Sequence, residues 1–157
     1  EFAAIADAIT VNYPWGSLII QTHRDPLRVA PSHCSMIMPF IQMKTDALDA
    51  KEVGRFISRR WGGMADDVID LRQRIGDDRF IDLQFEDLQD RPIETVREVF
   101  ERMGARMSAD DEGGMNQWLV ENRREKWSPH IYNYETYGLS EEIIRKDFAR
   151  YIARHCS

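Results

Sequence analysis

Apolar residues recur with helical spacing over most of the chain. The clearest case is residues 49–76, where apolar positions three or four residues apart form one stripe along a long predicted helix. Gly62-Gly63 interrupts this stretch and predicts either a break or a close contact with another helix, because each glycine costs a helix about 1 kcal/mol relative to alanine. The same spacing predicts further helices over residues 1–13, 26–43, 92–103, 108–127 and 140–152.

Two shorter segments have the pattern of β-strands. Residues 18–22 form a short apolar run of the kind that is buried on both faces of a parallel sheet. Residues 79–85 alternate apolar and polar side chains and predict a second strand, followed by an acidic loop over residues 86–90. Because two parallel strands do not form a stable sheet alone, we expect further strands of the sheet upstream of Glu1. The pattern therefore predicts a helix-rich α/β fold with two evident parallel strands.

Composition and charge exclude several classes of protein. The 157 residues are 43% hydrophobic and 31% charged, which is typical of a globular domain or of part of one. The 27 acidic residues outnumber the 21 basic ones, and the net charge of −6 argues against non-specific binding of nucleic acid. No apolar run approaches the ~18–20 residues that cross a bilayer. Cys34 and Cys156 are too few for a disulfide framework and favour a reducing, cytoplasmic location.

The segment QTHRDPLRVAPS, residues 21–32, carries the clearest candidate chemistry. It places Arg24 at the carboxyl end of a strand and just before a helix, with Asp25 as the expected N-cap and Pro26 as the first helical residue. Ligands of open α/β sheets bind at this edge, and helix N-terminal amides together with a bidentate guanidinium suit a phosphate. Ser32, about two turns further along the helix, adds a hydroxyl. The alternative is that Arg24 pairs with Asp25 or with an acidic loop.

The helix predicted from Pro26 to Met43 contains two interior prolines, Pro31 and Pro39. An interior proline removes one backbone hydrogen bond and clashes with the carbonyl four residues before it, so we expect a kink or a 3₁₀ start. His33 and Cys34 follow the first proline closely. Neighbouring side chains on a helix diverge by ~100°, and the chain has no spaced set of cysteines and histidines, so we expect no metal site.

These residues resemble the 3′-phosphate-binding element of sulfotransferases that use 3′-phosphoadenosine 5′-phosphosulfate (PAPS). In that family an arginine at a strand end is followed by a proline two residues later and a serine eight residues later, as in Arg24, Pro26 and Ser32. A proline lies directly before Ser32, and in this the segment resembles the bacterial branch of the sulfotransferase family. Phe85 begins FEDLQDRP, which resembles the family's YEDL segment. Residues 130–139, HIYNYETYGL, resemble the stretch H-x-Y-x-x-E-x-[FY]-G-L near the end of these proteins.

The resemblance implies a fold and a reaction. The fold would be the C-terminal part of a P-loop-containing nucleoside triphosphate hydrolase-like three-layer sandwich, so that residues 1–157 are a partial sulfotransferase domain. The reaction would transfer a sulfuryl group from PAPS, as co-substrate, to a hydroxyl or amine of a small-molecule, carbohydrate or lipid acceptor. The loop 129–139 would close the nucleotide pocket; its aromatic side chains fit ordinary packing equally well.

The resemblance also implies roles for individual residues. Arg24 and Ser32 would hold the 3′-phosphate, and Phe85 would border the adenine, because its ring remains although the usual tyrosine hydroxyl is absent. Basic residues in a late loop reach the 3′-phosphate in this family, which makes Arg124 and Lys126 candidates. The alternative for these two is a basic helix C-terminus, which the helix dipole favours.

Other parts of the family pattern have no counterpart in the chain. We find no glycine-rich phosphate loop with its lysine, and no histidine in the position of the family's upstream base. We therefore assign no catalytic residue, and we expect the 157 residues alone to be inactive and, through an uncovered sheet edge, to self-associate as a possible homo-oligomer. Two other functions stay open: a non-catalytic helical α/β interaction module, and a fragment of a P-loop kinase-like phosphotransferase.

Overall fold

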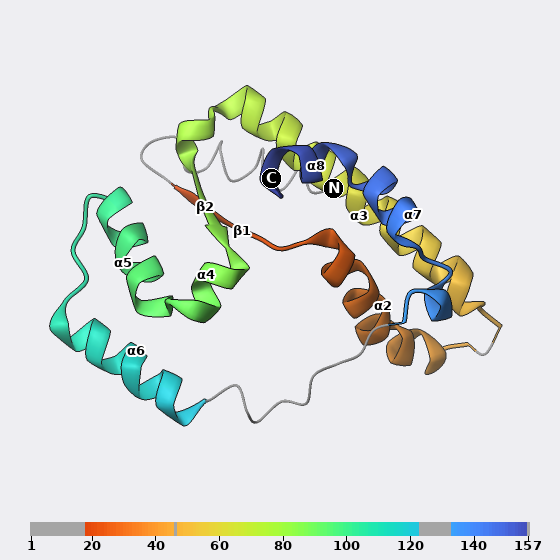
Figure 1. The fold of residues 1–157 in the computed structure, drawn as a ribbon, viewed down its shortest axis with the longest axis horizontal. Helices are drawn as coiled ribbons and strands as arrows, with labels where there is room; N and C mark the ends of the chain where they lie inside the picture. Colours follow the sequence, from red (N-terminus) through yellow and green to blue (C-terminus); the bar gives the residue numbers. More distant parts are fainter. Residues whose placement is uncertain (1–17, 46, 123–132, 157) are drawn as a thin grey trace. The chain divides into compact units, whose positions relative to one another are not determined.

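The computed structural model describes residues 18–45, 47–122 and 133–156 (Figure 1). Of these, residues 18–23 and 78–122 form one compact unit, the strand unit, and residues 24–77 and 133–156 form a second, the helical unit. Along the chain the elements are β1 (Ile19–His23), α2 (Pro26–Gln42), α3 (Ala50–Ile75), η1 (Asp77–Arg79), β2 (Phe80–Gln84), α4 (Phe85–Asp90), α5 (Pro92–Arg102), α6 (Ala109–Glu121), η3 (Glu135–Tyr137), α7 (Glu141–Asp147) and α8 (Ala149–His155).

The strand unit is built on a pair of parallel strands. Ile19 of β1 lies opposite Phe80 of β2, and His23 lies opposite Gln84. Phe80 and Ile81 are buried, α4 and α5 pack against β2, and α6 packs against α5 (Figure 1). The predicted helix-rich α/β fold with two parallel strands is therefore confirmed.

In the described part of the chain β1 is covered on one face, whereas its apolar run predicted a strand buried on both. Gln21 is half-buried and His23 is buried, whereas Ile20 is 50% exposed. Burial thus alternates along the strand, as in a sheet that is covered on one face only. The apolar run could not distinguish the two cases, because a hydrophobic side chain does not specify whether another element covers it.

The segment after β2 is a short helix and not the predicted acidic loop. Phe85 begins α4 instead of ending the strand. Glu86 and Asp87 lie in the first turn, where the positive end of the helix dipole favours acidic side chains. Arg91 closes the helix, because its backbone N–H donates to the Asp87 carbonyl at 2.9 Å and its Nε donates to the Asp87 carboxylate at 3.2 Å.

The later helices of the strand unit begin and end on local signals. α5 begins at Pro92, as predicted, and Gly104 follows its end with φ +72°, the left-handed conformation that glycine adopts after a helix. Ser108 caps α6 in a capping box with Asp111, which confirms the predicted start. α6 ends at Glu121, earlier than the predicted end near residue 127.

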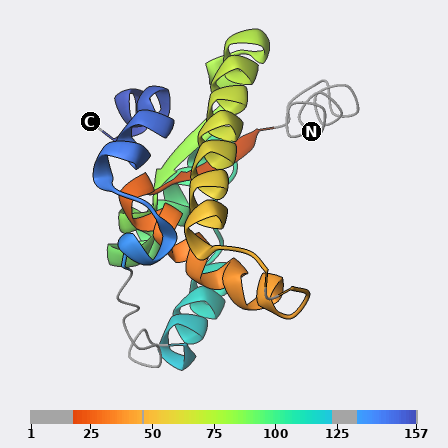
Figure 2. The ribbon, with the colours of Figure 1, turned by 90° about the vertical axis from the view of Figure 1, so that its right-hand side faces the viewer.

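The core of the helical unit forms where α3 packs against α2, α7, α8 and η3. Both views show α7 and α8 running alongside α3 (Figure 1 and Figure 2). Phe56, which lies on the predicted apolar stripe of α3, is nevertheless 66% exposed. The buried apolar cluster comprises Ala30, Cys34, Met38, Val53, Ile57, Leu139, Ile144 and Phe148.

α3 continues unbroken through Gly62 and Gly63. A Cβ on Gly62 would overlap the backbone oxygen of Asp147 at the end of α7, whereas a Cβ on Gly63 would meet nothing within 4 Å. Of the two interpretations of this glycine pair, the close helix contact is confirmed and the break is wrong. Gly54 likewise lets the backbone of Tyr137 approach α3.

The helix predicted over residues 140–152 is two short helices. Ser140 caps α7 as expected, by accepting a hydrogen bond from the Ile143 N–H. The backbone leaves the helical conformation at Phe148, with φ −109° and ψ 23°, and α8 follows. Ile144 and Phe148 are both buried, so the predicted core residues are correct although the helix is divided. An apolar spacing of three and four does not reveal a one-residue break, because both short helices keep the same period.

Candidate functional site

The candidate phosphate site lies where β1 passes into α2. The Asp25 side chain caps α2 by accepting a hydrogen bond from the Leu27 N–H at 2.9 Å, and Pro26 is the first helical residue. The predicted succession of strand, Arg24 and capped helix is thereby confirmed. α2 is α-helical from Pro26 to Gln42, so of the two effects expected at Pro31, a kink or a 3₁₀ start, the 3₁₀ start is wrong and the kink stays a prediction.

The first amides of α2 are already hydrogen-bonded within the chain. Leu27 N–H donates to the Asp25 carboxylate, and the N–H groups of Arg28 and Val29 donate to the Asp25 carbonyl at 2.9 and 3.1 Å. Pro26 has no N–H to offer. The expectation that free helix amides help to hold an anion is therefore corrected, and recognition of a phosphate at this helix start must rest on side chains.

Arg24 and Ser32 both belong to the helical unit, and both side chains are half-buried. Ser32 lies six residues after Pro26, which is about 9 Å of helix rise. Half-burial leaves each side chain partly accessible to a ligand while packing restricts its rotamers. Their roles in holding a phosphate stay predictions.

A hydrogen bond that sequence reasoning missed joins the aromatic loop to α2. The Tyr134 hydroxyl donates to the carbonyl of Leu27 at 2.9 Å. Leu27 lies four residues before Pro31, so its carbonyl is the one that loses its helical donor to the proline. The sequence contains both parts of this contact, a tyrosine-rich loop and an interior proline. They lie more than a hundred residues apart, so no local pattern relates one to the other.

In its described part, the loop around Tyr134 packs onto the core through Tyr134, Tyr137 and Leu139. Tyr134 and Tyr137 pack against the apolar core cluster, which favours the packing interpretation for these two rings. Gly138 adopts φ +58° and lies so close to Lys51 that a side chain would overlap it. Leu139 then enters the core. Residues 133–139 of the resembling stretch thus anchor the loop to the helical unit.

The other residues predicted to contact the nucleotide do not belong to the described part of the helical unit, where Arg24 and Ser32 lie. Phe85 belongs to the strand unit, where it is half-buried at the start of α4. Arg124 and Lys126 lie outside the described residues, as do the helix predicted over residues 1–13 and residues 129–132 of the aromatic loop.

One polar pair in the strand unit was also missed. The His23 ring, which is fully buried, lies 2.7 Å from the Asp82 carboxylate (Nε2 to Oδ1). Asp82 pairs with Gln21 in the strand register, two residues from His23, so both side chains belong to the same face. Only the register of the two strands could have revealed this pair.

Cys34 belongs to the buried core, whereas its neighbour His33 on α2 is half-buried. Burial raises the pKa of the Cys34 thiol to about 11, so this thiol stays protonated at neutral pH and is a poor nucleophile. Burial also lowers the pKa of His33, whose ring centroid lies 4.2 Å from that of Trp61. Cys34 therefore contributes packing to the core, and the His33 ring packs against Trp61.

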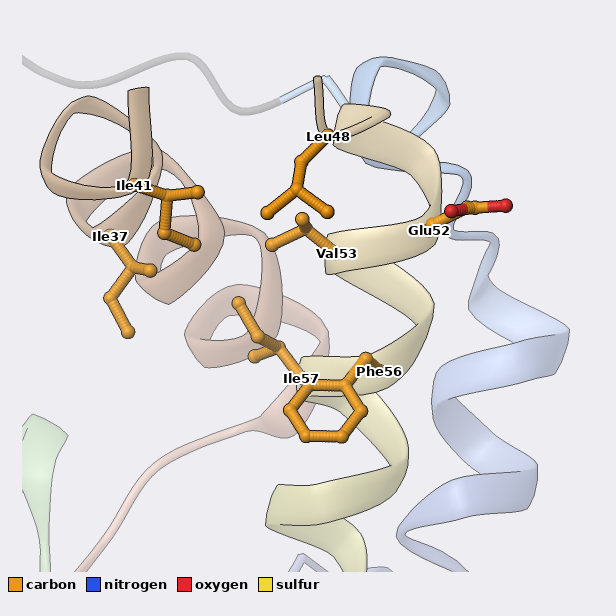
Figure 3. Close-up of a pocket in the computed structure, with 7 residues that line it drawn as sticks. All are labelled: Ile37, Ile41, Leu48, Glu52, Val53, Phe56 and Ile57. Carbon is orange, nitrogen blue, oxygen red and sulfur yellow. The ribbon is translucent and has the colours of Figure 1, made fainter. Parts of the chain in front are cut away.

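An apolar pocket of about 450 Å³ opens between α2 and α3 in the helical unit (Figure 3). Its size and lining are those of a site for an apolar group. In Figure 3 the Glu52 carboxylate points away from the apolar side chains. The sequence did not indicate the pocket, because its walls come from both helices and from the turn between them: Ile37, Ile41, Leu48, Glu52, Val53, Phe56 and Ile57.

Comparison with known proteins identifies the family. The structure resembles the crystal structure of sulfotransferase STF9 from Mycobacterium avium with a TM-score of 0.85 and 26% sequence identity, over 98% of this chain and 39% of that one. No curated protein matches the chain significantly. None of the helices in the described residues is long and apolar enough to span a membrane. The model of the sulfotransferase family matches residues 6–109, more than half of the chain. The chain therefore belongs to the sulfotransferase family and has a helix-rich α/β fold of the P-loop NTPase-like class.

Proposed function

We propose that the protein takes part in sulfuryl transfer from PAPS to a hydroxyl or amine acceptor. The observation that carries the proposal is Arg24, which lies half-buried between β1 and the cap of α2 in a chain that belongs to the sulfotransferase family. Ser32 on the same helix supplies the second polar group. Together they fit the 3′-phosphate that distinguishes PAPS from an ordinary adenine nucleotide.

The reaction requires mainly positioning and charge stabilisation. The bond between sulfur and the bridging oxygen of the 5′-phosphate breaks, a new S–O or S–N bond forms to the acceptor, and the acceptor proton passes to a base. 3′-Phosphoadenosine 5′-phosphate (PAP) leaves. Arg24 and Ser32 hold the nucleotide at its 3′ end, away from the reacting sulfur, so they bind the co-substrate and do not take part in bond making.

Side chains rather than backbone amides carry this proposed recognition. Because Asp25 occupies the first amides of α2, the guanidinium of Arg24, and not the helix amides, supplies positive charge at this end of the proposed site. Arg24 must also offset the negative charge of the neighbouring Asp25. Phe85, Arg124 and Lys126 are proposed as further nucleotide contacts on the strength of the family resemblance.

Binding of PAP compared with AMP tests the proposal. Charge-assisted hydrogen bonds contribute about 1.5–3 kcal/mol each, so Arg24→Ala should weaken PAP binding by about tenfold or more and leave AMP binding nearly unchanged. Arg28→Ala is the matched control, because Arg28 is an exposed arginine on the first turns of the same helix. Calorimetry that gives equal affinities for PAP and AMP in the unsubstituted protein would overturn the proposal.

The family assignment favours this function over the phosphotransferase alternative. The interaction-module alternative has one observation in its favour. Phe56, which lines the pocket between α2 and α3, is 66% exposed. A second hollow that shares Ile41 and Leu48 with this pocket is lined by Phe40 and Met43, which are 61% and 74% exposed. Contiguous exposed apolar surface marks binding sites. Phe56→Ser should weaken binding of an apolar partner or acceptor there without changing PAP affinity, and unchanged binding of both would argue against this use of the pocket.

A further inference from the structure

We propose that Tyr134 is a positioning residue for the nucleotide site, because its hydroxyl replaces the helical hydrogen bond that Pro31 removes from α2. The inference rests on the proposed function of Arg24 and Ser32, and it adds Tyr134, which stands at an unspecified (x) position of the family-like stretch 130–139.

Pro31 leaves a gap in the hydrogen bonding of α2. In a regular α-helix the N–H of residue 31 would donate to the carbonyl of Leu27, and proline has no N–H. The turn before the gap is closed by Asp25, which accepts from the N–H groups of Arg28 and Val29. The missing bond is therefore one of those that would join the capped first turn to the turn that carries Ser32.

The Tyr134 hydroxyl fills this gap from another part of the chain. It lies 2.9 Å from the Leu27 oxygen and donates to it. The carbonyl of Tyr134 accepts from the N–H groups of Tyr137 and Leu139 at 3.0 Å each, so its own backbone is held in a tight turn. Because its ring also packs against the core cluster, the hydroxyl is presented from a fixed position.

This link lies between the two proposed phosphate ligands. Arg24 precedes the capped turn, and Ser32 immediately follows Pro31. If one phosphate binds both, their relative placement depends on the helix geometry across the gap. Loss of the hydroxyl would let the two turns move relative to each other and lower the fraction of molecules in the binding-competent arrangement. The apparent affinity falls in proportion to that fraction.

Tyr134→Phe removes only the hydroxyl and keeps the packed ring. We expect it to weaken PAP binding by about three- to tenfold, the range for loss of one ordinary hydrogen bond, with little change for AMP. Tyr137→Phe is the matched control, since the Tyr137 hydroxyl has no hydrogen bond with the described part of the chain. Calorimetric titration with PAP and with AMP, together with the thermal midpoint, measures both variants.

Pro31→Ala should remove the effect of Tyr134→Phe on PAP binding. It restores an N–H that can donate to Leu27, so the hydroxyl becomes redundant. Tyr134→Phe should then have less than a twofold effect on PAP affinity when it is combined with Pro31→Ala. If Pro31→Ala does not fold, the comparison between the two tyrosine variants decides alone.

The outcomes separate the inference from the proposed function. Equal affinities for PAP and AMP in the unsubstituted protein would overturn the proposed function. A clear preference for PAP that Tyr134→Phe leaves unchanged would overturn the positioning role alone. A Tyr134→Phe variant that weakens PAP and AMP equally, or that lowers only the thermal midpoint, would assign the hydroxyl a purely structural role and would also overturn the inference.

Discussion

Alanine substitutions of the adjacent glycines 62 and 63 should change stability in opposite directions. Both residues lie in the interior of α3, where alanine is more favourable than glycine by about 1 kcal/mol. At Gly63 a Cβ meets nothing within 4 Å, so Gly63→Ala should gain most of this amount. At Gly62 the new Cβ would overlap the backbone oxygen of Asp147, and a backbone atom cannot swing aside as a flexible side chain can.

The cost at Gly62 follows from overpacking. Forcing an extra carbon into a packed contact typically costs about 1–3 kcal/mol, and displacement of a backbone segment belongs at the upper end of that range. Subtracting the gain in helix propensity leaves Gly62→Ala destabilised by about 2 kcal/mol. The two variants should therefore differ by about 3 kcal/mol although they add the same methyl group to neighbouring positions of one helix.

Urea unfolding followed by circular dichroism at 222 nm measures the difference. The midpoint should rise for Gly63→Ala and fall for Gly62→Ala, with similar slopes, because similar surface is exposed on unfolding. A Gly62→Ala variant as stable as Gly63→Ala would refute the close packing of α3 against the end of α7. Equal destabilisation of both variants would show that α3 is not helical across this pair.

Three further predictions concern other contacts of the helical unit. Ser58→Ala should cost about 2 kcal/mol, because the buried Ser58 hydroxyl donates to the Asp147 carboxylate at 2.6 Å; urea unfolding measures the loss, and an unchanged midpoint would contradict it. Two neighbouring arginines lower the pKa of Asp77, so its stabilising effect exists above its ordinary pKa of about 4 and disappears as the pH falls through the lowered value. Asp77→Asn should therefore lower the urea midpoint at pH 6 but not at strongly acidic pH, and a pH-independent difference would disprove the linkage. Iodoacetamide at pH 8 should modify the exposed Cys156 quickly and the buried Cys34 only after unfolding; equal rates would contradict the packing of α2.

Local chemistry explains which parts of the fold could be predicted from the sequence. Asp25, Pro92 and Ser108 each mark a helix start, because a cap or a first-turn proline acts through backbone groups only two or three residues away. The spacing of apolar residues along α3 identified the helix for the same reason. The residues that produce such a signal lie within a few positions of one another, so the signal can be recognised in a single sequence.

Features that depend on distant segments could not be predicted in this way. The contact of Gly62 with Asp147, the exposure of Ile20 and the hydrogen bond from Tyr134 to Leu27 each depend on which element lies opposite. The occupied amides at the start of α2 are an intermediate case. Asp25 was expected as the cap, but which N–H groups its side chain and carbonyl accept from became evident only in the structure.

In the candidate site, too, the local features could be predicted from the sequence and the contact between distant segments could not. The order of Arg24, capped helix and Ser32 followed from residue types over twelve positions, and the structure confirms that local order. The residue that completes the helix between them comes from the far end of the chain. No periodicity or cap predicts it, because the relation between Pro31 and Tyr134 exists only after the aromatic loop has packed onto the core.

The pairing of β1 with β2 has a consequence for how the chain folds. Residues 24–79 lie between the two strands, so the parallel pair forms only by closing a long loop that contains α2 and α3. Closing a flexible loop of roughly 50–60 residues costs about 3–4 kcal/mol in entropy, and early compaction of the two helices shortens the effective loop. Strand pairing should therefore be a late, non-local event whose rate depends on helices that contribute no residue to the sheet. A substitution that loosens α3 would then delay formation of the sheet, and it would leave the newly made β1 exposed as an unpaired apolar strand for longer, which is when such a strand is most prone to aggregate.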